Sequence, residues 1–510
     1  MSPAAARGRQ AMKAFIEKIK NLEHRAVPLL LRGLAVLLLA CIPYKVLGTG
    51  YLPPDDATRH AAKAVSEKSW GEILVLRGGA ELDPEQGWNS LLGAVRKLTG
   101  RDQKGLVRFS VAALFVLFAC VPLLLVKRPE AWLLALLLLV VANFDIFGRL
   151  LTGRPFLFTT LYVAAAALTW RRLREKPAAY GLLGALTLLA ALAAWTNTAL
   201  FLPAALFCLA LFLAREWRAG AALSATALAG TLLGAVLTGR PLSFLAQAPE
   251  RLFLTLKLYL PQAARVGEFQ PATGDYRLLL IVVFFLMWRA LKKDRGAAAA
   301  ADPVFLLLAL GWVGGFVSAR LWLDLGITAW LVWTCGQLEE ILEAAGSLLS
   351  LKRLVFAAAL LPALYLAAVN DSYGRWSSIG PYTWMAEVAE QDAGWLPGKG
   401  GVVYSSDSGI FYCMFFHQPR AEWKYVLGAE PALMPAGDLA VFNEILALKG
   451  AAAAYAPWTA KMKPEDRLVL AGSAVRPAIP GLEWNYLADQ VWFGRLPAPK
   501  KKPGDGRRAS

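Results

Sequence analysis

The sequence predicts a mostly helical membrane protein, a polytopic bundle of about eleven spans followed by a small α/β domain. Of its 510 residues, 57% are hydrophobic and the mean hydropathy is +0.45, whereas soluble domains are about half apolar. Apolar runs close to the roughly 20 residues that a bilayer requires recur from residue 28 to residue 369. After residue 370 the composition becomes mixed, with short apolar runs at 401–404 and 468–470 and a helical stretch at 438–449.

Lysine and arginine residues in the loops predict the orientation of the spans. Residues 1–27 are basic and amphipathic, which places the N-terminus in the cytoplasm. Basic clusters at 127–128, 171–176 and 292–295 then also fall on the cytoplasmic side, and an odd number of spans places the C-terminus outside. The expected spans are approximately residues 28–48, 106–126, 131–148, 156–170, 178–196, 198–214, 220–238, 277–291, 303–318, 321–337 and 353–369.

This topology divides the chain into four parts in the inner, cytoplasmic membrane of a bacterial-type cell. Two long loops, residues 49–105 and 239–276, are expected on the outer, periplasmic side. The four parts are a cytoplasmic basic segment (1–27), the transmembrane domain (28–369), an extracytoplasmic α/β domain (370–498) and a disordered basic tail (499–510).

The formal net charge of +17 does not indicate nucleic-acid binding. The basic residues form short clusters between apolar runs, not a stripe on one domain, so they are topology signals. Five cysteines without paired spacing and three scattered histidines support neither a disulfide framework nor a zinc site.

Two adjacent carboxylates, Asp55 and Asp56, stand just outside the first span. Pro53 and Pro54 suit the entry to a helix, so the pair is expected in the first turn of the segment 57–68. Free N–H groups and the helix dipole favour negative charge there, and capping of the helix is the alternative explanation for the pair.

Other ionisable side chains are expected at the same outer level, which suggests a polar cavity rimmed by cations. Arginine binds phosphate through a planar fork, and a carboxylate beside it could take a proton from a hydroxyl or hold a divalent cation. The alternative is that Asp145 with Arg149, and Arg320 with Asp324, only neutralise each other as i,i+4 pairs. The candidates for binding substrate or phosphate are Arg59, His60, Lys63, Arg149, Arg154 and Arg320, and a second acidic group is Asp145 or Glu85.

This arrangement resembles the GT-C superfamily of polyprenyl-phosphate-sugar-dependent glycosyltransferases, which includes protein O-mannosyltransferases and lipid A aminoarabinose transferases. The matching residues are Tyr51-Leu52-Pro53-Pro54-Asp55-Asp56 after the first span and Asp83-Pro84-Glu85-Gln86-Gly87-Trp88 in the same loop. The motifs cover only this loop, while the architecture matches along the whole chain. Many members have Asp-Glu or a spaced acidic pair, so Asp-Asp leaves open which carboxylate is the base.

The resemblance implies a GT-C-like bundle that transfers a sugar, with inversion, from a polyprenyl-phosphate-linked donor to an acceptor glycan, lipid or protein at the outer face. Asp55 or Asp56 would be the catalytic general base. From their positions, Arg149, Arg154 and Arg320 would assist departure of the polyprenyl phosphate. A divalent cation, Mg or Mn, is an open expectation.

Two further functions compete with this interpretation. One is a non-enzymatic translocator or transporter of lipid-linked saccharides, and the other is the membrane component of a cell-surface polysaccharide assembly complex. Mid-span positions are almost wholly apolar, which favours a one-sided site over a path across the membrane.

Overall fold

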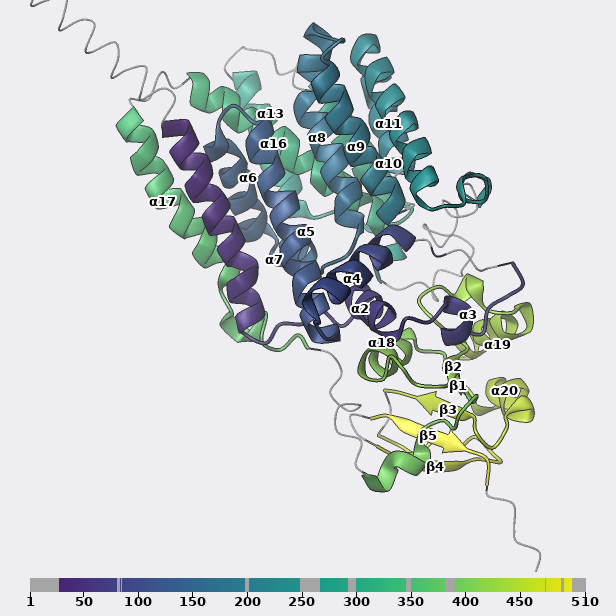
Figure 1. Cartoon of the computed structure of the whole chain (residues 1–510). Helices are drawn as coiled ribbons and strands as arrows, with labels where there is room; N and C mark the ends of the chain where they lie inside the picture. The colour runs from purple at the N-terminus through teal and green to yellow at the C-terminus, as the bar shows by residue number, and fades with distance from the viewer. Residues whose placement is uncertain are drawn as a thin grey trace, which may run out of the picture.

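A helical bundle followed by a small sheet domain forms the chain (Figure 1). The computed structural model describes residues 27–79, 83, 85–197, 201–247, 267–291, 300–344, 350–380, 390–472, 474–487 and 490–497. The bundle contains a first helix (Val27–Gly48), α5 (Gln103–Leu125), α6 (Pro129–Ala142), α7 (Phe144–Gly148), α8 (Phe156–Glu175), α9 (Tyr180–Thr196), α10 (Phe201–Leu213), α11 (Trp217–Leu237), α13 (Tyr276–Leu291), α15 (Pro303–Gly315), α16 (Ile327–Ala344) and α17 (Ser350–Val369).

Several of these helices can cross a bilayer, so the chain is a membrane protein. The first helix, α5 and α11 are long and apolar enough to span it. Residues 144–151 and α8 form a bent pair that counts as a fourth span if taken together. Each expected span overlaps a helix, but most of the other helices are shorter, so the count of eleven crossings stays a prediction.

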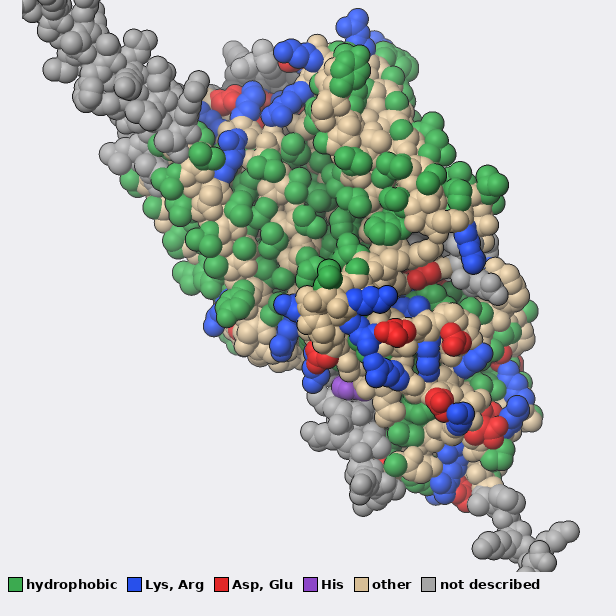
Figure 2. All heavy atoms as spheres, viewed as in Figure 1, with side chains coloured by type: hydrophobic (Ala, Val, Ile, Leu, Met, Phe, Trp, Pro, Cys, Tyr) green, Lys and Arg blue, Asp and Glu red, His purple; other side chains and the backbone are tan. Residues whose placement is uncertain are grey.

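The surface of the bundle carries a broad belt of hydrophobic side chains (Figure 2). Large apolar residues such as Leu37, Leu188, Leu228 and Phe284 are exposed on the helices of the bundle, as a lipid-facing surface requires. Lysine and arginine gather at the end of the bundle far from the sheet domain, and charges of both signs cover the other end. This separation of charge is what alternating spans with basic loops on one side would produce.

The third expected span ends earlier than predicted. It was expected to run to residue 148, but α6 ends at Ala142 and Asn143 is extended. The Asn143 side chain accepts a hydrogen bond from the N–H of Ile146 and so begins α7 as a cap. The short helices over 144–151 then bend by 110° from α8. This bend places Asp145, Arg149 and Arg154 at the end of the bundle next to α2 instead of along a span.

The first outer loop is helical and its helix α2 (Asp56–Ser66) is packed on several sides. It contacts α4 (Gln86–Thr99), α5 and α18 (Ser408–His417) of the sheet domain. Small buried residues such as Ala57 and Ala61 allow this close approach. The packing fixes the start of α2, where Asp55 and Asp56 stand.

The C-terminal domain is built on a five-stranded mixed sheet with the order β2-β1-β3-β5-β4. Strand β1 pairs parallel with β2 and β3, and β5 pairs antiparallel with β3 and β4. The apolar runs at 401–404 and 468–470 fall on strands, and the helical stretch 438–449 largely coincides with α19 (Ala436–Ala447). The strands are β1 (Val402–Tyr404), β2 (Lys424–Tyr425), β3 (Arg467–Leu470), β4 (Glu483–Tyr486) and β5 (Trp492–Arg495).

The first outer loop is joined to this sheet. After α3 (Trp70–Ile73), Leu74 forms a parallel bridge with Tyr425 of β2, and the N–H of Val75 donates to the Tyr425 carbonyl at 2.9 Å. The loop thus continues the edge of the sheet. The two parts meet around α2, α3 and α18 (Figure 1).

Several predictions lie outside the described residues, among them the basic loop cluster at 292–295. The others are the basic amphipathic segment (apart from residue 27), the basic tail, and the part of the predicted second outer loop over residues 248–266.

Candidate active site

Asp55 precedes α2 but does not cap it with its side chain. It occupies the N-cap position, and its backbone carbonyl accepts from the N–H groups of Thr58 and Arg59. Its carboxylate makes no capping hydrogen bond. The capping explanation therefore does not account for this side chain.

Arg154 holds one oxygen of the Asp55 carboxylate. Its Nη2 and Nε donate to Asp55 Oδ2 at 2.7 and 3.1 Å. The other oxygen, Oδ1, is buried and has no hydrogen-bond partner among the described residues. A buried acceptor without a partner costs about 1–3 kcal/mol, so a hydroxyl that donated to Oδ1 would remove this cost. Asp55 is thus fixed on one side and unsatisfied on the other.

Asp56 is more fully engaged than Asp55. Its Oδ1 accepts from Arg59 Nη2 at 3.1 Å and from the Tyr412 hydroxyl at 3.0 Å, and its Oδ2 lies 3.8 Å from Arg154 Nε. Burial acts to raise the pKa of Asp56, but the guanidiniums of Arg59 and Arg154 outweigh it and hold the pKa below its usual range. Asp56 is therefore a weak base, placed to hold its neighbours.

Three predicted phosphate-binding residues of α2 do not face an open site. Arg59 is buried and bound to Asp56 and to Glu85 Oε2, the latter at 3.1 Å. His60 is fully buried, with Nδ1 2.7 Å from Asn89 Oδ1. Lys63 donates to the Lys68 carbonyl and lies over the Trp70 ring. The three residues lie on a helix as predicted, but the packing around α2 buries Arg59 and His60 and directs Lys63 towards Lys68 and Trp70.

The buried histidine is neutral near pH 7. Burial lowers the pKa of His60 to about 4, and the adjacent Arg59 guanidinium adds to this effect. Burial also raises the pKa of Glu85, although Arg59 opposes the shift. Glu85, the alternative second acidic group, therefore serves as a partner of Arg59 behind the Asp pair.

A chain of alternating charges extends from Asp55 away from α2. Arg154 also donates to Glu268 Oε2 at 2.9 Å, and the same oxygen accepts from Arg149 at 3.1 Å. Burial acts to raise the pKa of Glu268, but Arg154, Arg320 and Arg149 together lower it to about 2. Glu268 thus remains ionised and joins the two arginines beside Asp55.

The outer part of this network contains Arg149, Asp324 and Arg320. Arg149 Nη2 donates to Asp324 Oδ1 at 2.8 Å, and Arg320 Nε donates to Asp324 Oδ2 at 3.1 Å. The i,i+4 ion pair of Arg320 with Asp324, which was the alternative to a substrate-binding role, is present. The pair of Asp145 with Arg149 is not, because Arg149 turns towards Glu268.

A cavity of about 560 Å³ adjoins Asp55. Charged side chains of both signs line it, together with an aromatic wall in which Trp376 packs edge-on against Tyr51 and Phe144. Tyr276 at its edge is exposed and begins α13, whose Leu280 and Phe284 are also exposed in the lipid-facing belt. The cavity therefore opens beside the membrane surface. Its ionisable lining residues are Asp55, Asp145, Arg149, Asp275, Tyr276, Arg277, Arg375 and Tyr51.

The structure brings together some predicted site residues and adds others. Arg154 contacts Asp55 directly, Arg149 is linked through Glu268, and Arg320 is one pair further away. Glu268 and Tyr412 were not predicted. Glu268 lies in the predicted second outer loop. An acidic residue in a loop close to the membrane was the one feature of the sequence that could have suggested it. Tyr412 comes from the sheet domain, 356 positions from Asp56, and no local pattern pointed to it.

The carboxylates at the site do not form a set of metal ligands as arranged. Asp55, through one of its two oxygens, Asp56 and Glu268 each bind an arginine. Within the described part of the chain, His, Cys, Asp and Glu form no group of three that could hold a metal ion. The reaction below is derived from these side chains without a metal ion.

No family model matches the chain, and no curated protein matches it in sequence. Three solved structures from Archaeoglobus fulgidus are similar to it. The oligosaccharyltransferase tethered with an acceptor peptide containing the NVT sequon has 12% identity and a TM-score of 0.47, covering 86% of this chain and 68% of that chain. Its apo form has 12% identity and a TM-score of 0.46, covering 89% and 70%.

The third similar structure is the archaeal oligosaccharyltransferase AglB in complex with an inhibitory peptide and a dolichol-phosphate. It has 11% identity and a TM-score of 0.48, covering 85% of this chain and 68% of that chain. A TM-score below 0.5 does not establish a common fold.

Proposed function

We propose that this chain is an inverting membrane glycosyltransferase that uses a polyprenyl-phosphate-linked sugar, with Asp55 as general base. The observation that carries the proposal is the state of Asp55. One of its carboxylate oxygens is held by Arg154, and the other is unsatisfied beside a cavity rich in arginine. A general base must be ionised, oriented and able to accept a proton from the attacking hydroxyl.

In the proposed reaction, Asp55 Oδ1 takes the proton of the acceptor hydroxyl while the acceptor oxygen attacks the anomeric carbon. The bond from that carbon to the phosphate oxygen breaks, and the polyprenyl phosphate leaves with the bonding electrons. Arg149 lines the cavity and is the predicted cation best placed to stabilise the leaving phosphate. Arg277 and Arg375, which line it too, extend the phosphate site towards the membrane surface.

The remaining predicted residues have supporting roles. Arg154 orients Asp55, and Arg320 supports Arg149 through Asp324. Asp56, Arg59 and Glu85 form the layer behind the base. The exposed Asp145 lines the cavity and is a candidate for orienting the acceptor.

The orientation follows from the same proposal. The Asp55 site and the sheet domain lie at the outer face of the cytoplasmic membrane, where an acceptor glycan, lipid or protein would arrive. The basic end of the bundle then faces the cytoplasm, in agreement with the positive-inside bias.

Transfer by the purified chain tests this function against translocation. Vesicles containing the chain and a labelled polyprenyl-phosphate sugar are supplied with extracted envelope glycans, lipids and proteins. We expect a new glycosidic bond whose anomeric configuration is opposite to that of the donor. Movement of the labelled lipid between leaflets without a new bond would instead support the translocator.

A further inference from the structure

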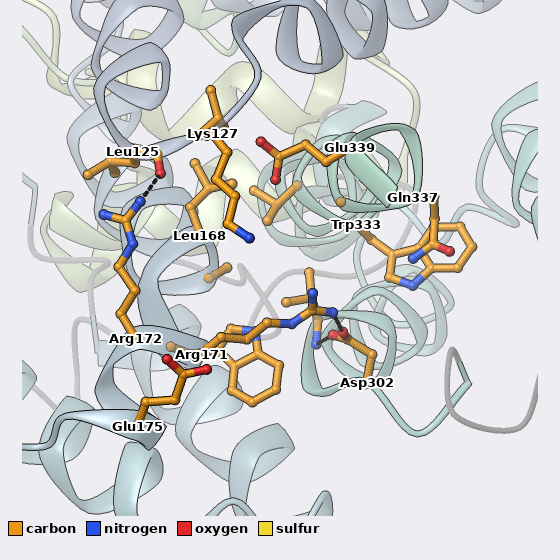
Figure 3. Close-up of a pocket in the computed structure, with 16 residues that line it drawn as sticks. Leu125, Lys127, Leu168, Arg171, Arg172, Glu175, Asp302, Trp333, Gln337 and Glu339 are labelled. Atoms are coloured by element: carbon orange, nitrogen blue, oxygen red, sulfur yellow. Dashed lines mark hydrogen bonds and ion pairs between the residues drawn. The ribbon is translucent and has the colours of Figure 1, made fainter. Parts of the chain in front are cut away.

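A second cavity lies at the end of the bundle far from the sheet domain, among the ends of α5, α8 and α16 and the start of α15 (Figure 3). Its volume is about 210 Å³, which suits a small polar group better than a whole lipid or a folded peptide. It is separate from the Asp55 site, and neither the proposed reaction nor the resemblance to glycosyltransferases accounts for it.

The positive charges of two side chains at this cavity, Lys127 and Arg172, are only weakly balanced by carboxylates. In Figure 3 the ammonium group of Lys127 points into the middle of the cavity, and the nearest carboxylate oxygen paired with it, on Glu343, is 3.8 Å away. Arg172 donates to the backbone carbonyl of Leu125 at 2.7 Å, a neutral acceptor. Arg171, by contrast, is paired with Asp302 at 2.8 Å. Lys127 and Arg172 therefore retain charge for an anionic group.

Two carboxylates line the same space. Glu339 accepts from the backbone N–H of Arg128 at 2.9 Å, which leaves its negative charge without a cation at that contact. Glu175 is exposed at the end of α8 beside Arg172. The cavity thus offers cationic and anionic groups within one small volume, which suits a ligand carrying both charges.

An unsatisfied donor gives independent support for a ligand. Trp333 lines the cavity and is 2% exposed, and its indole N–H is buried without a hydrogen-bond partner in the part of the chain that the structure describes. Buried tryptophan N–H groups usually find an acceptor. Leu168 and Val332 give the cavity an apolar side next to this donor.

We propose that this cavity binds the headgroup of an amine-bearing, zwitterionic phospholipid. The phosphate would contact Lys127 and Arg172, the ammonium would contact Glu175 or Glu339, and the Trp333 N–H would donate to a phosphate or ester oxygen. The acyl chains would continue along the hydrophobic belt of the bundle. A cavity between helix ends with charges of both signs can bind both charges of a zwitterionic headgroup through charge-assisted hydrogen bonds.

Native mass spectrometry of the full-length chain tests the proposal. The probes are phosphatidylethanolamine and phosphatidylglycerol with identical acyl chains, each added in increasing amounts to the delipidated protein. We expect tighter binding of phosphatidylethanolamine. Lys127→Ala and Trp333→Phe should each weaken it about tenfold, roughly the effect of losing one hydrogen bond to a charged group.

The matched control is Arg218→Ala, because Arg218 is exposed at the same end of the bundle and does not line the cavity. This variant should bind both lipids like the unaltered chain. Glu175→Gln should reduce the preference for phosphatidylethanolamine over phosphatidylglycerol. Should Trp333→Phe unfold, Lys127→Ala still decides, since the Lys127 side chain is 73% exposed. Equal binding of the two lipids, or unchanged binding by Lys127→Ala, would overturn the proposal.

Discussion

Replacing Arg154 by Gln is expected to release two carboxylates that this arginine holds together. The Arg154 side chain is 17% exposed, and those of its partners Asp55 and Glu268 are 26% and 20% exposed. Removal of one member of a buried ion pair costs about 3–5 kcal/mol. Because these groups are partly exposed, the lower end of this range applies, about 3 kcal/mol.

The same ion pair holds Asp55 in position, so its removal should also slow the reaction. If Arg154 acts by orienting the base, a loss of about 3 kcal/mol corresponds to a decrease in kcat/KM on the order of 100-fold. The assay is initial-rate transfer from a labelled polyprenyl-phosphate sugar by the purified variant. The matched control is Arg320→Gln, since Arg320 pairs with Asp324 at the far end of the network and should lose less than tenfold.

A double-mutant cycle separates orientation of Asp55 from a general effect of charge. Because Arg154 is proposed to act through Asp55, the variant Arg154→Gln/Asp55→Asn should be no slower than Asp55→Asn alone. If the two losses instead multiply, Arg154 acts independently of Asp55, and the proposed orienting role is wrong.

Three further predictions concern His60, Tyr412 and Arg277. In the unfolded chain His60 takes up a proton below its ordinary pKa of 6.5, whereas in the folded chain its pKa is about 4. The neutral, buried His60 therefore contributes fully to stability above pH 6.5, and this contribution is lost as the pH falls towards 4. Denaturant unfolding should show a loss of up to about 3 kcal/mol across this window that His60→Gln lacks; an identical pH profile for both would contradict the buried neutral state. Tyr412→Phe removes the hydroxyl bound to Asp56 and should lower kcat/KM about tenfold. The control is Tyr486→Phe on the distant strand β4. Equal rates for the two variants would exclude a role for the Tyr412 hydroxyl. Arg277→Ala should raise the KM for the lipid-linked donor about tenfold with kcat little changed, and a fall in kcat alone would remove Arg277 from donor binding.

The sequence was sufficient to predict the helical character, the trailing sheet domain and the helix that begins at the Asp pair. Apolar runs locate the helices because a segment buried in lipid must satisfy its backbone hydrogen bonds internally. Basic loops indicate which helix ends lie together on one side of the bundle. From these two patterns Arg154 could be expected near Asp55, although 99 positions separate them. The end of the third span could not be predicted, because the cap formed by Asn143 interrupts an apolar pattern that continues beyond it.

Contacts in the site could be predicted only between residues that the span pattern places at the same depth relative to the membrane. Helical spacing gives the face of α2 on which His60 and Lys63 lie, but not the elements that cover that face. The sheet domain packs α18 against α2 and brings Tyr412 to Asp56, a contact that depends on the folding of a separate domain. Glu268 likewise comes from a loop whose course no periodic pattern specifies.

Single-turnover transfer by Asp55→Asn and Asp56→Asn tests the central claim most directly. Both variants keep the size of the side chain and remove the negative charge, so they compare the two neighbouring carboxylates under the same change. Loss of a general base should slow the chemical step of Asp55→Asn by about 10²–10⁴-fold, while Asp56→Asn, which weakens only the support around the base, should slow it by about tenfold. A normal rate for Asp55→Asn, or a larger loss for Asp56→Asn, would contradict the assignment of Asp55 as the base.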